Sequence, residues 1–315
     1  MRNVEKLMNT PTPFLTDGGF ETWMFFVDGF EAPEFSALML MDDAEARAAM
    51  RDNFDRYLAI AADAGTGFVL DTATWRGCIS WTAKLDTTAG DLLRLSRDAV
   101  AFAVETRDAW SPRVQPIVVN GVIGPVGDGY DATTAPDAAS AEALHTPQIK
   151  TMVDAGAEMI SAITMTNTAE AIGVVRAARD AGAPVVISFT VETDGRLPSG
   201  ETLADAIART DAATGGEPLY YMVNCAHPDH FRGAMETGED WLSRIGGLRA
   251  NASRMSHEEL DNSETLDDGN PVEFGQLHAE MTPLFPNLRV VGGCCGTDHR
   301  HVGCVSDHLH KKIAA

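Results

Sequence analysis

The feature of this sequence that most constrains its fold is an alternation of short apolar runs with longer amphipathic stretches. Eight runs have the length and composition of β-strands, and most lack a strict alternation of polar and apolar residues. Such runs are expected for parallel strands that are buried on both faces. They cover residues 13–17, 67–72, 114–121, 158–164, 184–190, 219–225, 245–251 and 287–293.

The stretches between these runs have the periodicity of helices. Residues 44–65, 91–110 and 169–182 place apolar side chains at steps of three and four, and Gly65 and Gly182 suit helix C-caps. Eight strands that alternate with helices predict an α/β fold, a single (β/α)8 TIM barrel domain over residues 1–315. A doubly wound sheet is the alternative, but no glycine-rich dinucleotide fingerprint follows the first strand.

The charge of the chain limits the partners that it can bind. It has 46 acidic residues against 24 Lys plus Arg, a formal net charge of −22. Such a surface repels phosphate backbones and anionic lipids, so we expect small-molecule substrates and neither nucleic acid nor membranes as partners. The N-terminus lacks the apolar core of a secretory signal, and no run of about 18 apolar residues occurs, which predicts a cytoplasmic protein.

The cysteines are few and unevenly placed: Cys78, Cys225, Cys294, Cys295 and Cys304. An odd, sparse set in a chain of this length predicts thiols, either buried or chemically active, and not a disulfide framework. Cys225 ends the sixth predicted strand, and Cys294 and Cys295 follow the eighth. Both strand ends lie at the C-terminal mouth of a barrel, where active sites of this fold are built.

Glycines surround the adjacent pair, in the stretch Gly292–Gly293–Cys294–Cys295–Gly296. Neighbouring side chains on a strand point in opposite directions, so both sulfurs can reach one ion only if the backbone turns sharply, which glycine permits. Three thiolates with an open fourth position are the arrangement of a reactive zinc centre. Buried core thiols and a disulfide between the adjacent pair are the alternatives, and Cys78 and Cys304 are interpreted as ordinary thiols.

The polar stretch 253–271 follows the seventh predicted strand. Its position places it at the C-terminal mouth of the barrel, where loops carry function. We expect either a lid over the site or an ordinary solvated loop.

Three motifs together resemble the zinc-dependent homocysteine S-methyltransferases, a family that includes betaine–homocysteine and S-methylmethionine–homocysteine methyltransferases. They are LTDGGFET at 15–22, VNC at 223–225 and GGCCGT at 292–297, with weaker similarity at 123–128 and 186–207. The resemblance implies that Cys225, Cys294 and Cys295 bind Zn²⁺ and act in catalysis through it. It also implies that the amino-acid part of homocysteine binds at Asp17, Gly18 and Gly19, and that Asn251 is a displaceable ligand in the fourth zinc position.

The sequence departs from the family pattern at two places. The family usually carries a Glu near the end of the fourth strand, where this chain has Ile163 or Thr164. After GGCCGT the family commonly continues with a Pro and one His, but this chain continues with DHRHV, which places His299 and His301 on the last helix. The missing carboxylate leaves open an acceptor other than homocysteine.

The resemblance implies transfer of a methyl group from a small onium donor to the thiolate of homocysteine, which gives methionine. The donor would be S-methylmethionine, S-adenosylmethionine, betaine or a similar cation, and aromatic side chains can hold such cations. Candidates for this cage follow the first two strands: Trp23, Phe25, Phe26, Trp75 and Trp81. The alternatives are a methyltransferase that acts on another thiol or a selenol, and a non-catalytic zinc or redox barrel.

Overall fold

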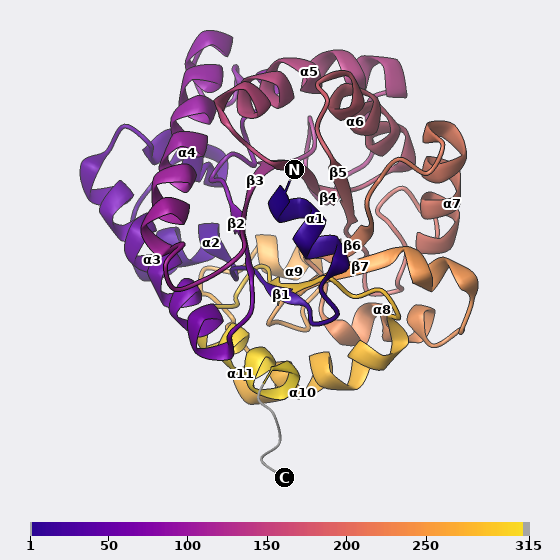
Figure 1. Cartoon of the computed structure of the whole chain (residues 1–315). Coiled ribbons are helices and arrows are strands. Elements are labelled where there is room, and N and C mark those ends of the chain that lie inside the picture. Colours follow the sequence, from indigo (N-terminus) through magenta and orange to yellow (C-terminus); the bar gives the residue numbers. More distant parts are fainter. Residues whose placement is uncertain (1, 311–315) are drawn as a thin grey trace.

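The computed structural model describes residues 2–310, which form one closed barrel of eight parallel strands (Figure 1). The strands follow one another around the barrel in sequence order, and β1 pairs with both β2 and β8. The predicted (β/α)8 barrel is therefore confirmed. The doubly wound alternative is wrong, because such a sheet is open and this one closes on itself.

All eight predicted strands are present, with ends that shift by a few residues. They are β1 (Phe14–Leu15), β2 (Phe68–Asp71), β3 (Ile117–Ile123), β4 (Met159–Met165), β5 (Val185–Phe189), β6 (Tyr221–Asn224), β7 (Ile245–Ala250) and β8 (Val290–Gly293). Every residue of these strands is buried. This burial on both faces explains why the runs show no polar alternation.

Helices surround the strands, most of them in a ring and the others at the two ends of the barrel. They are α1 (Arg2–Asn9), α2 (Phe20–Thr22), α3 (Ala44–Ala64), α4 (Ala89–Trp110), α5 (Ala138–Ala155), α6 (Thr168–Asp180), α7 (Leu203–Thr214), α8 (Pro228–Met235), α9 (His257–Asp261), α10 (Pro271–Met281) and α11 (His299–Leu309). Local signals fix their ends: the Asp43 side chain caps the start of α3, and Gly65 ends it with φ +65°. No helix within residues 2–310 is both long enough and apolar enough to cross a bilayer.

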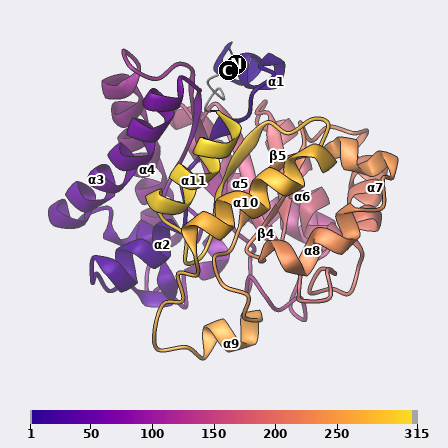
Figure 2. The same cartoon turned by 90° about the horizontal axis from the view of Figure 1, so that it is seen from below.

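The N-terminal helix α1 closes one end of the barrel, where Figure 1 shows it in front of the strands. Val4 and Leu7 are buried there, and Asn3 Nδ2 donates to Ile117 O at 3.1 Å and to Glu158 Oε1 at 3.0 Å. Glu158 therefore lies at the end of the barrel that α1 covers. Figure 2 shows α9 at the opposite end, where the strands terminate.

The interior of the barrel changes in character along its axis. An apolar cluster includes Val69, Val118 and Met159 together with the buried residues of α1. Two residues further along the same strands the inward positions are polar: Asp71, Asn120 and Ser161. Because side chains two apart share a face, the polar groups form a layer nearer the C-terminal mouth.

Candidate active site

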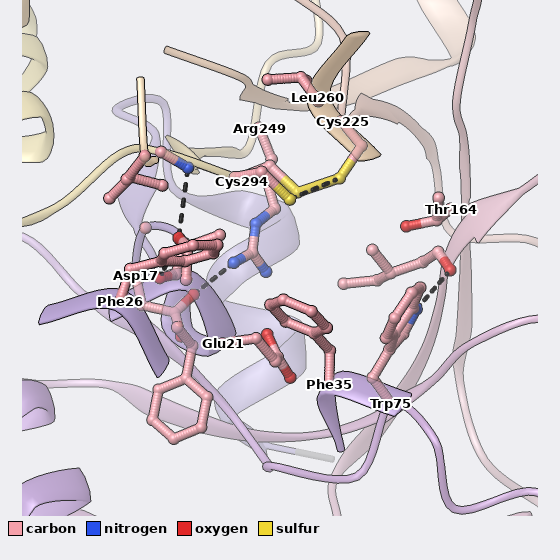
Figure 3. Close-up of a pocket in the computed structure, with 18 of the residues that line it drawn as sticks. Asp17, Glu21, Phe26, Phe35, Trp75, Thr164, Cys225, Arg249, Leu260 and Cys294 are labelled. Atoms are coloured by element: carbon pink, nitrogen blue, oxygen red, sulfur yellow. Dashed lines mark hydrogen bonds and ion pairs between the residues drawn. A yellow bond between two sulfur atoms is a disulfide. The ribbon is translucent and has the colours of Figure 1, made fainter. Parts of the chain in front are cut away.

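Three cysteine side chains meet at the C-terminal mouth of the barrel. The Sγ atoms of Cys225, Cys294 and Cys295 all lie within 4.8 Å of one another. Cys225 and Cys294, which are 69 residues apart in the sequence, are joined as a disulfide (Figure 3). The Sγ atom of Cys295 lies 3.6 Å from that of Cys225. The barrel therefore gathers the three predicted ligands at one point. The disulfide joins Cys225 to Cys294, so it differs both from the free thiols that we predicted and from the alternative of a disulfide between the adjacent pair.

The backbone explains this convergence. The strands β6 and β8 both pair with β7, and the N–H groups of Cys225 and Cys294 donate to β7 carbonyls at 3.2 and 2.8 Å. Cys225 has φ +53°, a left-handed conformation that turns the chain at the end of β6. After β8, the Thr297 N–H donates to the Cys294 carbonyl at 3.1 Å and closes the predicted turn. A Cβ on Gly293 would lie 1.9 Å from Thr297 Oγ1, so this turn requires glycine there.

The three sulfurs fit one metal ion once they are thiolates. A Zn–S bond of about 2.3 Å and tetrahedral angles place two sulfur ligands roughly 3.8 Å apart. The 3.6 Å between the Sγ atoms of Cys225 and Cys295 is close to that value. A disulfide cannot supply two thiolates, so the bond between Cys225 and Cys294 must be reduced before all three can coordinate.

Asn251 has a buried side-chain oxygen without a hydrogen bond. Its side chain is 2% exposed, and within residues 2–310 its Oδ1 has no hydrogen-bond donor. The residue directly follows β7, and its backbone N–H donates to Ala226 O at 3.0 Å. A buried polar atom without a partner is costly, so this carbonyl oxygen is available to a ligand.

The sulfurs open into a cavity of about 400 Å³. The predicted substrate residues Asp17, Gly18 and Gly19 all line it, whereas Asn251 lies outside its lining. A Cβ on Gly19 would lie 2.6 Å from the Cys294 carbonyl oxygen. This glycine therefore lets the segment after β1 pack directly on the turn that carries the cysteines.

A buried arginine that we did not predict stands at the centre of the site. Arg249 of β7 is 6% exposed and lines the cavity. Its guanidinium pairs with both Asp17 and Asp71, and its Nε donates to Gly293 O at 3.1 Å (Figure 3). Asp71 also accepts from Asn120 Nδ2 at 2.7 Å. The Asp17 carboxylate, which the resemblance assigns to the amino-acid part of the substrate, is thus also part of an internal network.

Two carboxylates share this one guanidinium. Burial raises the pKa of Asp17 to about 7, and the negative charge of Asp71 adds to the rise, although the charge of Arg249 opposes it. Burial alone would lower the pKa of Arg249, but the two carboxylates raise it further above its usual value. The cluster therefore holds one more potential negative charge than positive charge.

The end of β4 has no carboxylate, as the sequence indicated. Thr164 lines the cavity with φ +66°. Its N–H donates to Asn224 Oδ1 and its Oγ1 accepts from Asn224 Nδ2, both at 2.9 Å. Asn224 Nδ2 also lies 3.8 Å from Cys294 Sγ. This amide therefore ties the end of β4 to the cysteine cluster.

A model of the homocysteine S-methyltransferase family matches residues 14–309. The chain belongs to this family. The match covers the strands that carry all three cysteines, and it confirms the resemblance seen in the sequence. It also confirms the enzyme class, a methyltransferase that acts on homocysteine.

Individual relatives agree with this membership. A homocysteine S-methyltransferase of Bacillus subtilis (strain 168), YbgG, is 25% identical over 293 residues, which are 85% of each chain. The oxidized form of the homocysteine methyltransferase MmuM from Escherichia coli superposes with a TM-score of 0.73 at 19% identity, over 96% of this chain and 98% of that one. The metallated form of the same protein superposes with a TM-score of 0.73 at 18% identity, over 96% of this chain and 99% of that one. These structures support the fold.

The aromatic lining of the cavity differs in part from the predicted cage. Phe26 and Trp75 line it, together with four aromatic residues that we did not predict: Phe20, Phe35, Phe54 and Tyr130. The other three candidates, Trp23, Phe25 and Trp81, lie outside the lining. Trp81 is 1% exposed, and Trp23 packs edge-on against His299 at 5.7 Å between ring centroids. Their positions near the strand ends were correct, but their side chains turn away from the cavity.

The polar stretch 253–271 covers the cavity in the manner of a lid. Leu260, Asp261 and Leu266 line the cavity from this segment. His257 of α9 hydrogen-bonds to the Cys225 carbonyl oxygen and stacks on Tyr130, with ring centroids 4.0 Å apart. Of the two interpretations from sequence, the structure supports the lid.

The two histidines after the cysteine motif serve the last helix and not the site. His301 is fully buried, and its Nδ1 accepts from the Asp298 N–H at 3.1 Å in a capping box at the start of α11. Neither His299 nor His301 lines the cavity.

Proposed function

We propose that this protein binds Zn²⁺ through Cys225, Cys294 and Cys295 and transfers a methyl group from a small onium donor to the sulfur of homocysteine. The observation that carries the proposal is the convergence of three sulfurs at the floor of the cavity. Three protein sulfurs leave a fourth position for the acceptor. Asn251, with its unpaired carbonyl oxygen, would occupy that position before the acceptor binds.

The chemistry requires an ionised acceptor sulfur. A free thiol with a pKa of about 8.5 is ~3% ionised at pH 7, which costs roughly 2 kcal/mol. Bound zinc would supply that ionisation, because a coordinated thiol is deprotonated. The protein's own residues orient the substrate: Asp17, Gly18 and Gly19 would lie along the amino-acid part of homocysteine. Methyl transfer would then form the S–CH₃ bond of methionine and break the bond from that methyl group to the sulfonium sulfur or ammonium nitrogen of the donor, which keeps the electron pair and loses its positive charge.

The outer part of the cavity suits the cationic donor. Phe26 and Phe35 are 42% and 49% exposed, whereas Asp17 and Arg249 are 2% and 6% exposed. Phe26 and Phe35 thus stand nearer the solvent than Phe20 and Phe54, the buried aromatic groups of the same lining, and aromatic faces attract quaternary ammonium and sulfonium groups. A cavity of about 400 Å³ is at the small end of ligand sites, which run from roughly 300 to 1,000 Å³. This size favours S-methylmethionine or betaine over S-adenosylmethionine.

A redox function is the second candidate, because Cys225 and Cys294 are joined as a disulfide. An activity assay distinguishes the two. Reduced, zinc-loaded protein should form methionine from homocysteine and an onium donor, and Ser at any of the three positions should abolish methionine and lower bound zinc. Cys304→Ser, outside the cluster, is the matched control and should retain both methionine formation and bound zinc. Full activity in a zinc-free triple variant would overturn the proposal.

Direct ligation can be tested apart from turnover. X-ray absorption at the zinc edge should gain a sulfur neighbour near ~2.3 Å when homocysteine is added. Asn251→Ala should still bind zinc through the three cysteines, and it should show the same spectrum as wild type once homocysteine is bound. An unchanged spectrum in an active sample would exclude direct ligation.

A further inference from the structure

The acceptor of this reaction brings an ammonium group into the cavity, and most cavity carboxylates are already engaged. Asp17 and Asp71 share the guanidinium of Arg249. At the rim, the Glu34 carboxylate lies 3.9 Å from Lys84 Nζ. Asp267 accepts from Ser253 Oγ at 2.6 Å and from a backbone N–H at 3.1 Å. These contacts reduce the charge that each carboxylate can offer to a substrate.

Glu21 differs from these carboxylates. It lines the same cavity, and Figure 3 shows its side chain beside Phe35 and below the guanidinium of Arg249. Within residues 2–310 its carboxylate has no ion pair and no hydrogen bond to another residue's side chain. Asp261, the other cavity carboxylate without such a partner, is exposed on the lid. Glu21 is therefore the unpaired carboxylate of the cavity interior.

The backbone holds Glu21 in a fixed position relative to the cysteines. It lies in α2, and the flanking residues bind the turn after β8 from both sides. The Gly19 N–H donates to Thr297 O at 2.9 Å, and Thr22 Oγ1 accepts from the Gly296 N–H at 3.2 Å. Because this turn carries Cys294 and Cys295, these hydrogen bonds fix the backbone at Glu21 relative to the two cysteines.

Electrostatics favour a cation at this carboxylate. Burial raises the pKa of Glu21, although the charge of Arg249 and a hydrogen bond from its own backbone oppose the rise. A substrate ammonium beside Glu21 would offset the excess negative charge that Asp17, Asp71 and Glu21 hold against the single guanidinium of Arg249.

We propose that Glu21 binds the ammonium group of the homocysteine acceptor and selects an α-amino acid thiol over thiols that lack the amine. The inference rests on the proposed function. Glu21 is assigned to the acceptor because its segment binds the turn that carries Cys294 and Cys295, where the acceptor sulfur would lie, and because its side chain lies below the guanidinium of Arg249 (Figure 3). It supplies from α2 the charge that Thr164 does not supply at the end of β4.

The test compares two acceptors on two proteins. 4-Sulfanylbutanoate is homocysteine without its amino group, and Glu21→Gln keeps the size of the side chain while removing its charge. Isothermal titration of zinc-loaded protein should show that Glu21→Gln weakens homocysteine binding by about 10- to 150-fold. Binding of 4-sulfanylbutanoate should change by less than about threefold, and the KM for the methyl donor should stay the same.

The matched control is Glu31→Gln, which removes a carboxylate from an exposed position of the same segment outside the cavity. It should bind both acceptors like wild type. An equal loss for both acceptors would show a merely structural role, and a rise in the donor KM alone would assign Glu21 to the donor. Either result overturns the inference, as does an unchanged homocysteine affinity.

The binding readout separates this inference from the proposed function. If wild-type protein binds homocysteine in a manner that depends on Glu21 but forms no methionine, the inference stands and the methyl-transfer assignment fails. If the protein forms methionine and Glu21→Gln binds homocysteine as well as wild type does, the methyl-transfer assignment stands and the inference about Glu21 fails. A wild-type protein that binds no homocysteine overturns both.

Discussion

Arg249 and Asp17 form an ion pair inside the barrel, with their side chains 8% and 2% exposed. Asp71 binds the same guanidinium from β2, so the pair joins the ends of three strands, β1, β2 and β7, beside the cysteines. Removing one partner of a buried pair leaves a charge without compensation, which typically costs about 3–5 kcal/mol. This cost should differ between Arg249 and Asp17, because Arg249 serves two carboxylates whereas Asp17 has one cation.

We predict that Arg249→Met destabilises the fold and that Asp17→Asn does not. The first variant leaves two buried carboxylates without a cation and should lose about 3–5 kcal/mol of unfolding free energy. The second leaves Arg249 paired with Asp71 and removes the excess negative charge. Urea unfolding followed by circular dichroism at pH 7 measures both, and a larger loss in Asp17→Asn would contradict the role given to Arg249.

The same substitution also tests substrate binding. Because Arg249 already compensates the charge of Asp17, we expect Asp17→Asn to weaken homocysteine binding by about 2- to 10-fold, as for loss of an ordinary hydrogen bond. This loss should be smaller than that of Glu21→Gln, and bound zinc should stay at the wild-type level. A loss larger than that of Glu21→Gln would make Asp17 the principal ammonium partner.

The raised pKa of Asp17, about 7, predicts how stability depends on pH. Between pH ~4 and pH ~7 the unfolded chain releases this proton before the folded protein does. The folded state then binds more protons, so the Asp17 contribution to stability falls as pH rises through this window and is constant above it. The stability difference between Asp17→Asn and wild type should therefore grow from pH 4 to pH 7. A difference that is independent of pH contradicts the shift.

The barrel and the cysteine centre could be predicted because their signals lie in short stretches of sequence. The position of a cysteine at the end of a predicted strand is enough to place it in the fold. Uniformly apolar runs identify buried parallel strands, and strand ends of a barrel share one mouth, which places Cys225 near Cys294 despite a sequence separation of 69. Arg249 and Asp71 did leave a signal, since each is a charge inside an apolar run. A buried charge requires a partner, so the two could have been paired with each other from sequence.

Other features of the site depend on side-chain direction, which the sequence does not determine. Phe25 and Phe26 are adjacent, yet the second lines the cavity and the first does not. Their segment, Trp23–Val27, is a single π-helical turn, which is too short to show a repeat that would assign faces. Glu21 escaped notice for the same reason, because its orientation depends on contacts between α2 and the turn after β8.

The disulfide between Cys225 and Cys294 predicts a redox requirement for metal binding. Thiol titration of unfolded, unreduced protein should count three thiols, those of Cys78, Cys295 and Cys304, against five after reduction. Reduced protein should bind one zinc per chain, and the oxidised form should bind none, because two of its three ligands are not thiolates. Zinc bound by protein that still shows three thiols would contradict the assignment of Cys225 and Cys294 as ligands.

The position of Phe35 predicts a role in holding the methyl donor. Phe35 is 49% exposed at the cavity rim and packs on Phe25 and Phe26, with ring centroids 5.2 and 5.9 Å away. Phe35→Leu keeps an apolar side chain but removes the aromatic face. A cation–π contact at an exposed site contributes about 0.5–1 kcal/mol, so the KM for an onium donor should rise about two- to fivefold.

The KM for homocysteine should stay unchanged in Phe35→Leu, because the acceptor occupies the inner part of the cavity. Val27→Ala is the matched control: Val27 is 50% exposed on the same segment but lies outside the lining of this cavity. Steady-state kinetics with S-methylmethionine and with betaine measure both variants. A rise in the homocysteine KM with no change in the donor KM would reverse the assignment of inner and outer subsites, and equal effects in both variants would remove Phe35 from the donor site.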